Sequence, residues 1–495
     1  MRLNAKQIAA YTGGQFLVDP IDPSALMTGI TWDSREVQPD WLYVALPGER
    51  VDGHNFVEAA LRAGARGVLV MQPPVRSALL LAREMGAAVI EVANTTSAIT
   101  DLAREWRGHL HGRVVALTGS VGKTTTKNLL RDVCAAAGTV VATKANQNNE
   151  LGVPRTLLAA DPETATVVVE MGMRGQGQIT ELTDFVRPDW GLVTNVGESH
   201  IELLGSRENI ARAKAELFAA LPAGTGHAFL NAADDFAAFC AQQARLAERA
   251  VAVTAFDGSP QAEAHFATLE EAGVVLANRV WAEEVSLDEE GRPHFMLCAA
   301  GFSEGGSLER TPCALALQGA HNVANACAAA AVGRARGLML PVIARALAGS
   351  VPESGRQEMV VARDGFVVIN DAYNASPDSM RASLATFAAM TVNGRRIAVL
   401  GDMGELGDFA DACHRGVGEA AAAAPLDQLV CVGSLAALIA EGAEAAGMDP
   451  ARIVRAHTVA DVLEELDGRL ESGDAVLVKA SHFMELNRVV EGLVS

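Results

Sequence analysis

The chain has 495 residues, more than one hydrophobic core normally organises, so two or three domains are expected. Hydrophobic residues make up 49% and charged residues 20%, a globular composition that argues against long disorder. Forty Lys and Arg residues against 60 Asp and Glu residues give a formal net charge of −20. Such an acidic chain argues against unaided binding to nucleic acid or anionic membranes, which require clustered cations.

The sequence also suggests a compartment. No apolar run approaches the roughly 18 residues of a membrane-spanning helix, and the N-terminal segment has no long apolar core of a secretory signal. Seven cysteines are scattered without CxxC pairs, which is typical of reduced thiols. We expect a soluble, cytoplasmic monomer that does not insert into membranes.

The first domain is predicted to span residues 1–93 and to be small and of mixed α/β type. Its expected strands lie at residues 29–33, 41–46, 67–70 and 88–92, with a helix at 54–63 and a connecting helix at 95–109.

The central domain, residues 94–348, alternates apolar strands with helices. Strands that are apolar throughout are typical of a parallel sheet covered on both faces. Residues 251–318 break this alternation and suggest an antiparallel extension. The expected elements are strands at 114–117, 166–170 and 191–195, and helices at 124–137, 206–220 and 321–336.

The third domain, residues 349–495, alternates again and is predicted to be a Rossmann-like, doubly wound α/β domain. Ser376 and Pro377 have the residue types of a helix N-cap and a first helical position. The expected strands lie at 366–370, 397–400, 429–432, 453–455 and 475–478, and one helix at 377–390.

A glycine-rich loop between a strand and a helix is the strongest local signal. Its glycines let backbone N–H groups converge, the helix N-terminus adds a positive dipole and Lys123 adds a full charge. Thr124 offers a hydroxyl to a magnesium ion on the bound phosphates. Leu117 stands where the usual motif has glycine, which indicates a tighter loop variant. The predicted ATP-binding residues are Gly119, Ser120, Val121, Gly122, Lys123, Thr124 and Thr125.

Three further residues follow or interrupt the central elements. Glu170 ends an apolar strand, where a carboxylate faces the ligand crevice and can hold magnesium. His200 follows the next strand, although a single loop histidine is more often an ordinary surface residue. Lys214 interrupts the apolar stripe of its helix, and the simplest interpretation is a lysine that extends its ammonium to water. These patterns alone indicate an ATP- or GTP-using α/β enzyme.

Several stretches together resemble the Mur ligase family across all three domains. Within it, residues 370–377 and 401–407 resemble the members that add D-alanyl-D-alanine, and the Asp-Asn-Pro-Arg motif usual in the diamino-acid-adding members is absent. The other stretches that carry the resemblance are residues 33–35, 52–54, 118–125, 146–154, 169–172, 213–216 and 319–326.

The resemblance implies an ATP-dependent amide ligase of peptidoglycan synthesis that acts through an acyl phosphate. Its small-molecule substrates would be UDP-MurNAc-tripeptide and D-Ala-D-Ala. Two magnesium ions are implied, held by Thr124, Glu170, His200 and a carbamylated Lys214. The remaining implied residues are Asn325, Arg356 and Asp371 for the nucleotide, Ser34 and Arg35 for the uridine diphosphate, and Asn149, Tyr373 and Asn374 for the substrates.

Two alternatives remain open at this point. One is a sister ligase, either diamino-acid-adding or of the folylpolyglutamate type, although the latter lacks the region that Asp33, Ser34 and Arg35 represent here. The other is a P-loop switch or motor, against which stand Leu117 and the absence of an Asn-Lys-x-Asp guanine motif. The loop 479–482 reads Lys-Ala-Ser-His where the family commonly has Lys-Gly-Ser-Arg, so its role is left open.

Overall fold

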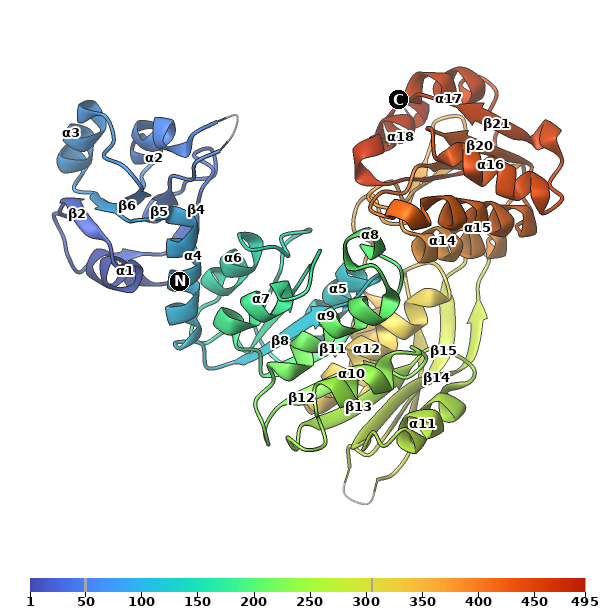
Figure 1. Ribbon diagram of the computed structural model, residues 1–495, viewed down its shortest axis with the longest axis horizontal. Helices are drawn as coiled ribbons and strands as arrows, with labels where there is room; N and C mark the ends of the chain where they lie inside the picture. Colours follow the sequence, from blue (N-terminus) through green and yellow to red (C-terminus); the bar gives the residue numbers. More distant parts are fainter. Residues whose placement is uncertain (49–50, 304–305, 495) are drawn as a thin grey trace.

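The computed structural model describes residues 1–48, 51–303 and 306–494, arranged around three large sheets. Figure 1 shows the first domain (blue) and the third domain (orange to red) at opposite ends of the central one. All seven cysteines are unpaired, and no helix among the described residues is long and apolar enough to span a membrane. The three-domain α/β architecture expected from the sequence is confirmed.

The first sheet has five strands in the order β2-β7-β6-β5-β4, of which only the β2–β7 pair is antiparallel. The helix expected at 54–63 is instead a 3-10 turn, η1 (Gly53–Phe56), followed by a shorter helix. Asp52 accepts from the His54 backbone N–H, and this cap holds the tight turn. The other elements are β1 (Leu3–Asn4), α1 (Ala5–Thr12), β2 (Gln15–Val18), β3 (Leu26–Met27), β4 (Gly29–Thr31), β5 (Trp41–Val44), α2 (Val57–Arg62), β6 (Gly67–Val70), α3 (Arg76–Met85) and β7 (Ala88–Glu91).

Helix α4 (Thr95–Arg107) joins the first two domains by packing against α1 on one side and against α6 (Gly152–Ala159) and α7 (Gln178–Val186) on the other. Its Trp106 is buried and donates to the Ala160 carbonyl at 2.9 Å. The predicted connecting helix therefore has a packed interface with both domains.

The central sheet has nine strands in the order β16-β15-β14-β13-β12-β11-β8-β10-β9. The six strands from β14 to β10 and the edge strand β9 are parallel to their neighbours, whereas β15 and β16 continue as the expected antiparallel extension. The strands are β8 (Arg113–Thr118), β9 (Val140–Ala142), β10 (Thr166–Glu170), β11 (Trp190–Val193), β12 (His227–Asn231), β13 (Ala252–Asp257), β14 (Asn278–Leu287), β15 (Pro293–Ala300) and β16 (Glu309–Ala314).

Both faces of the central sheet are buried, as the apolar strands predict. Val114 and Ala116 belong to one hydrophobic cluster and Val115 and Leu117 to the other, so alternate residues of β8 point to opposite sides. The alanines of α12 let that helix pack directly on α5. The remaining helices of this domain are α5 (Lys123–Ala135), α8 (Ile201–Leu204), α9 (Arg207–Ala219), α10 (Ala237–Gln243), α11 (Ala262–Glu271), α12 (His321–Ala335) and α13 (Leu340–Ala348).

The third sheet has the order β17-β18-β22-β19-β20-β21, parallel except for the antiparallel edge strand β17, which the sequence analysis missed. Ser376 caps α14 as predicted, with Pro377 as its first residue. The elements are β17 (Glu358–Val361), β18 (Val367–Asn370), α14 (Pro377–Ala389), β19 (Arg396–Gly401), η2 (Gly407–Phe409), α15 (Ala410–Ala423), β20 (Gln428–Val432), α16 (Ala436–Ala445), η3 (Pro450–Arg452), β21 (Ile453–Ala456), α17 (Val459–Leu466), β22 (Ala475–Lys479), η4 (His482–Met484) and α18 (Asn487–Val494).

Candidate active site

A cavity of about 1270 Å³ lies between the central and third domains, where the carboxyl ends of both parallel sheets face each other. In the central sheet β8 lies between β10 and β11, so the segments that follow these three strands converge. The predicted residues that line the cavity are Ser120, Val121, Gly122, Lys123, Thr124, Thr125, Asn149, Glu170, His200, Asn325, Arg356, Asp371, Tyr373 and Asn374.

The glycine loop connects β8 to α5 and depends on close approaches. A side chain at Gly119 would overlap Thr194 Oγ1, and one at Gly122, where φ is +78°, would lie 2.6 Å from Asn325 Oδ1. Only glycine fits either position without displacing these neighbours. The Lys123 ammonium folds back over the loop and donates to the carbonyls of Gly119 at 2.7 Å and Ser120 at 3.2 Å.

Two polar residues after β11 hold this loop from the adjacent strand. Asn195 Oδ1 accepts from the backbone N–H groups of Ser120 at 3.1 Å and Val121 at 2.9 Å. Thr194 donates its hydroxyl to the Val121 carbonyl at 2.7 Å. Sequence reasoning missed both residues, although their place at the end of a predicted strand is a usable signal.

Glu170 is fully buried at the end of β10, so its carboxylate is not an ordinary solvated strand end. Its Oε1 accepts from Asn148 at 2.8 Å and from the Thr124 hydroxyl at 3.4 Å, whereas its buried Oε2 has no hydrogen-bond partner. Lys127, also buried, lies 3.9 Å from Oε2 and 3.8 Å from Glu353 at the start of the third domain. Asn148 and Lys127 were not predicted.

The donors around Glu170 fit a magnesium ion. Magnesium in phosphate-binding sites is typically held by one or two carboxylates together with substrate oxygens, rather than by an all-protein cage. Among the described residues no three His, Cys, Asp or Glu side chains come together as such a cage. A buried carboxylate oxygen without a hydrogen-bond partner, beside a threonine hydroxyl and the phosphate loop, matches the first arrangement.

His200 lies at the start of α8 in a left-handed conformation with φ 65°, and it faces the cavity. Its Nδ1 lies 2.6 Å from Glu405 Oε2 of the third domain. Burial lowers the pKa of His200, an effect that Glu405 opposes and that Lys123 and Lys214 reinforce. The imidazole ring is therefore neutral at neutral pH, and a neutral ring has one nitrogen with a free lone pair that can bind a metal.

Lys214 does not reach water, contrary to the simplest interpretation of its sequence. It is 1% exposed, and within the described residues its ammonium has neither a hydrogen bond nor an ion pair. Burial, together with repulsion from Lys123, lowers its pKa well below the ordinary value. A buried amine without a counterion is stable only in its neutral form, and a neutral amine is nucleophilic. Lys214 is not among the residues that line the cavity, so the structure does not bring this predicted metal ligand to the cavity wall.

The closing helix α12 contributes Asn325, whose Oδ1 accepts from the Thr126 hydroxyl at 3.0 Å and whose amide donates to Asn322 at 2.8 Å. This orientation places the Asn325 side chain against the backbone of Gly122. Asn325 is therefore part of the wall of the phosphate loop, as its predicted nucleotide role requires.

The third domain provides the opposite wall. Arg356 stacks on the Tyr373 ring, with its guanidinium carbon 4.2 Å from the ring centroid. Lys479, from the neighbouring strand β22, donates to Asp371 Oδ2 at 2.7 Å and to the Asn374 carbonyl at 3.0 Å. The Asp371 carboxylate is thus engaged in an ion pair with Lys479. Asp371 therefore holds Lys479 in place and also lines the cavity.

The loop 479–482 keeps a lysine at the cavity despite its departure from the common pattern. Ala480 fits because Gly401 lies opposite, where a side chain would approach the Ala480 methyl within 2.6 Å. The Ser481 hydroxyl accepts from the Gly404 N–H at 2.9 Å, and His482 lies beside Tyr373 with ring centroids 5.8 Å apart. His482 also lines the cavity.

Ser34 and Arg35 lie in the first domain, outside this cavity. The Arg35 guanidinium is 88% exposed and pairs with Asp33 at 2.6 Å, and this contact lowers the pKa of the Asp33 carboxyl to about 2. The structure does not bring these two residues to the phosphate loop, so their role at the uridine-diphosphate end stays a prediction.

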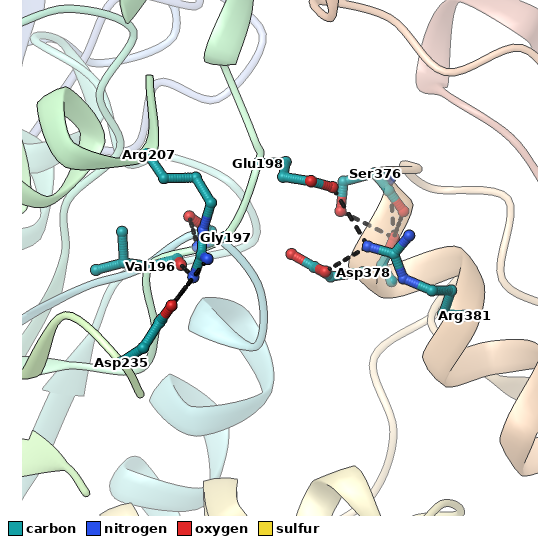
Figure 2. A network of polar contacts seen from close by, with 10 residues as sticks. Val196, Gly197, Glu198, Arg207, Asp235, Ser376, Asp378 and Arg381 are labelled. Carbon is teal, nitrogen blue, oxygen red and sulfur yellow. Dashed lines mark hydrogen bonds and ion pairs between the residues drawn. The ribbon is translucent and has the colours of Figure 1, made fainter. Parts of the chain in front are cut away.

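The loop that follows β11 also links the two large domains. Figure 2 shows Arg381 of α14 pointing towards Glu198 of the central domain and Asp378 of its own helix, at 3.3 and 2.9 Å. On the other side of this loop, Arg207 of α9 donates to the Val196 carbonyl at 2.8 Å. The Gly197 N–H donates to Ser120 Oγ at 2.8 Å, so the contact between domains adjoins the phosphate loop.

Comparisons with known proteins agree with this arrangement. Residues 26–107 match the Mur ligase family catalytic domain, 117–333 the Mur ligase middle domain and 355–482 the Mur ligase glutamate ligase domain. A UDP-N-acetylmuramoyl-tripeptide–D-alanyl-D-alanine ligase of Bacillus subtilis is 33% identical, with 100% of this chain and 99% of the relative covered. The chain belongs to the Mur ligase family. A switch or motor is thereby excluded.

Other relatives of this Mur ligase extend over similar lengths. The UDP-N-acetylmuramoyl-tripeptide–D-alanyl-D-alanine ligase of Mycobacterium tuberculosis is 37% identical, with 100% of this chain and 98% of the relative covered. The structure of MurF from Acinetobacter baumannii superposes with a TM-score of 0.81 at 29% identity, covering 100% and 99% of the two chains. MurF ligase from Thermotoga maritima in complex with ADP gives 0.72 at 25% identity, covering 94% and 97%.

Proposed function

We propose that this Mur ligase joins D-alanyl-D-alanine to UDP-N-acetylmuramoyl-tripeptide with conversion of ATP to ADP and phosphate. The observation that carries the proposal is the cavity between the two parallel sheets, with the phosphate loop on one wall and Arg356 and Lys479 on the other. Relatives with this activity in their names match the chain over its whole length.

The chemistry requires activation of a carboxylate, because an amine and a carboxylate do not condense in water when oxide is the leaving group. Transfer of the γ-phosphoryl group of ATP to the tripeptide carboxylate gives an acyl phosphate and ADP. Attack by the amine of D-alanyl-D-alanine forms a tetrahedral intermediate, which expels phosphate and leaves the amide. The protein contributes mainly positioning and charge neutralisation around the phosphoryl group.

Residues of two domains would bind the phosphates of ATP. Lys123 would leave the carbonyls of Gly119 and Ser120 to bind the β- and γ-phosphates, with the loop N–H groups beside it. Arg356, held flat on Tyr373, would bind phosphate oxygens from the opposite wall. Since these ligands belong to separate domains, closure of the third domain over ATP is part of the proposed cycle.

Two cation positions follow from the donors. Thr124 and Glu170 would hold one magnesium ion and His200 would help to hold a second. Magnesium at these positions would neutralise the charge that develops on the phosphoryl oxygens. The buried Oε2 of Glu170, which has no hydrogen-bond partner, supports the first position.

A carbamylated Lys214 is also proposed. The neutral amine would attack carbon dioxide, form a carbon–nitrogen bond and release one proton, leaving an anionic carbamate. An ammonium carries only donors and cannot bind a cation, whereas carbamate oxygens can bind magnesium or orient Lys123. The burial of Lys214 without a counterion supports this modification.

The substrates would span the three domains. Ser34 and Arg35 would contact the uridine diphosphate, and Asn149, Tyr373 and Asn374 would contact the reacting ends. Asn149 and Asn374 are exposed residues on opposite walls of the cavity, which supports this division.

Phosphate release tests the substrate assignment. The full chain is incubated with UDP-MurNAc-tripeptide, ATP and magnesium, and D-Ala-D-Ala is compared with diaminopimelate and glutamate as the amine. We expect phosphate release only with D-Ala-D-Ala. Turnover only with a free amino acid would instead assign the chain to a sister ligase.

A further inference from the structure

The turn at residues 31–36 of the first domain carries both residues predicted to contact uridine diphosphate, and hydrogen bonds of its own give it a defined shape. The Asp33 carboxylate accepts from the Arg35 N–H at 2.9 Å. The Asp33 N–H donates to Thr31 Oγ1 at 3.1 Å, and the Glu36 N–H donates to the Asp33 carbonyl at 3.0 Å. Because all these bonds lie within the turn, they do not fix its place relative to the central domain.

Arg155 connects this turn to the central domain. It belongs to α6, which lies on the side of the central domain that faces the first domain and packs against β4 (Figure 1). The Arg155 guanidinium donates to Glu36 Oε2 at 2.5 Å and lies over the Trp32 ring, with Cζ 5.2 Å from the ring centroid. The Arg155 side chain is only 21% exposed, so both contacts are partly shielded from water. One residue of α6 thus holds two side chains of the turn.

The same helix is also joined to the wall of the cavity. Asn149 lines the cavity, and its Oδ1 accepts from the Gly152 N–H at 2.9 Å, at the start of α6. The Asn149 carbonyl accepts from the Val153 N–H, also at 2.9 Å. Arg155 follows within about one turn of this helix, whose backbone hydrogen bonds make it stiff over such a length. The separation between the cavity wall at Asn149 and the side chain that holds the turn is therefore fixed by the fold.

A ligand with two connected ends binds best when its two sites are held at a matching separation, because binding of the second end is then intramolecular. We propose that Arg155 is a positioning residue, which holds the turn that binds uridine diphosphate at a fixed separation from the cavity and so favours substrates whose peptide spans that separation. This inference rests on the proposed ligase function for its substrate, but the contacts of Arg155 exist without one. Arg155 acts through Trp32 and Glu36 and touches neither uridine diphosphate nor the reacting atoms.

A matched control separates this role from simple docking of the two domains. Arg2 of the first domain makes another ion pair across the same boundary, with Asp161 at 3.5 Å, and this pair involves no residue of the turn. Arg2→Gln therefore weakens the boundary without releasing the turn. Arg155→Met keeps a long side chain but removes the guanidinium, and Arg155→Lys keeps the charge for Glu36 without the planar group over Trp32.

The first measurement needs no ligand. Hydrogen exchange of the full chain, followed by mass spectrometry of its peptides, reports how often the hydrogen bonds of the turn open. We expect exchange in residues 31–36 to be about 10-fold faster in R155M and unchanged in R2Q, with the neighbouring strand β6 protected equally in all proteins. Unchanged exchange of the turn in R155M would overturn the proposal, whatever the substrate assay shows. Equal acceleration in β6 would assign Arg155 to the general stability of the first domain and would also overturn it.

The second measurement compares two ligands by calorimetric titration into the full chain. UDP reaches only the turn, whereas UDP-MurNAc-tripeptide reaches both the turn and the cavity. We expect the Kd of UDP-MurNAc-tripeptide to rise about 10-fold in R155M, less in R155K and not in R2Q, while the Kd of UDP changes by less than about 2-fold throughout.

Two results of this titration would overturn the proposal. One is an unchanged Kd of UDP-MurNAc-tripeptide in R155M, and the other is equal weakening of both ligands, which would make Arg155 a support of the UDP site alone. Failure of the unmodified protein to bind either ligand would instead contradict the proposed ligase function, while the exchange result would still decide whether Arg155 holds the turn.

Discussion

Gly152 provides a prediction whose sign depends on the structure. Replacement of a helical glycine by alanine normally stabilises a protein by about 1 kcal/mol, because the unfolded chain loses freedom. Gly152 begins α6, and a methyl group there would lie 2.6 Å from Gln147 Cα and closer still to its carbonyl group, well inside the ordinary contact distance of 3.4 Å. The obstacle is backbone, which cannot rotate away. Overpacking of this kind costs about 1–3 kcal/mol, so Gly152→Ala should destabilise the protein by about 1–2 kcal/mol.

The same substitution should also reduce activity. The displaced segment includes Asn148, which donates to Glu170 Oε1 at 2.8 Å. A shift of the order of 1 Å in a positioned group lowers turnover by up to about 100-fold, so a loss of at least about 10-fold in kcat is expected. Calorimetric unfolding and phosphate release measure the two effects.

Gly416 in α15 is the matched control, because a methyl group there would meet only Arg381 Nη1, at 3.8 Å. Gly416→Ala should raise the free energy of unfolding by up to about 1 kcal/mol and leave turnover unchanged. A Gly152→Ala protein as stable and as active as the Gly416→Ala protein would refute the packing argument.

Three further predictions concern single side chains. Arg356→Lys loses both the bidentate fork and the stacking on Tyr373, so the KM for ATP should rise about 10-fold in steady-state assays, and an unchanged KM would remove Arg356 from the nucleotide site. Lys214→Ala should fold normally but turn over only when acetate or formate replaces the carbamate, and full activity without such rescue would contradict the carbamate proposal. Burial lowers the pKa of His227 to about 4, below the ordinary value of 6.5, so the unfolded chain binds the proton first. Stability should therefore fall as the pH drops from 6.5 towards 4, and chemical denaturation of His227→Phe should show a flatter pH dependence over that window.

The features that could be predicted from the sequence are local. The alternation of apolar strands with helices predicts the central sheet, and the phosphate loop is recognisable because its glycines, lysine and threonines are consecutive. Glu170 was placed correctly since it ends a strand of the same sheet. The prediction of one helix over residues 54–63 was wrong. The turn capped by Asp52 makes residues 53–56 a 3-10 turn, and the helix begins only at Val57.

The missed residues depend on contacts between distant segments. Asn195 reaches the phosphate loop because β11 pairs with β8, about 75 residues earlier in the chain. Lys479 meets Asp371 only because β22 lies next to β18 in the third sheet. Glu405 contacts His200 through the docking of two domains. Neither a hydrophobic periodicity nor a sequence motif specifies the order of strands in a sheet or the way two domains dock. The contacts of these three residues can therefore be identified only from the three-dimensional structure.

The account depends on one event, the transfer of a phosphoryl group from ATP to a carboxylate oxygen in the cavity between the sheets. Tripeptide substrate labelled with ¹⁸O in its terminal carboxylate tests this directly when the released phosphate is analysed by mass spectrometry. The account predicts one ¹⁸O atom in each phosphate, because the carboxylate oxygen that attacks phosphorus leaves with it. Phosphate free of ¹⁸O, released together with the amide product, would contradict the acyl phosphate and with it the role assigned to the site.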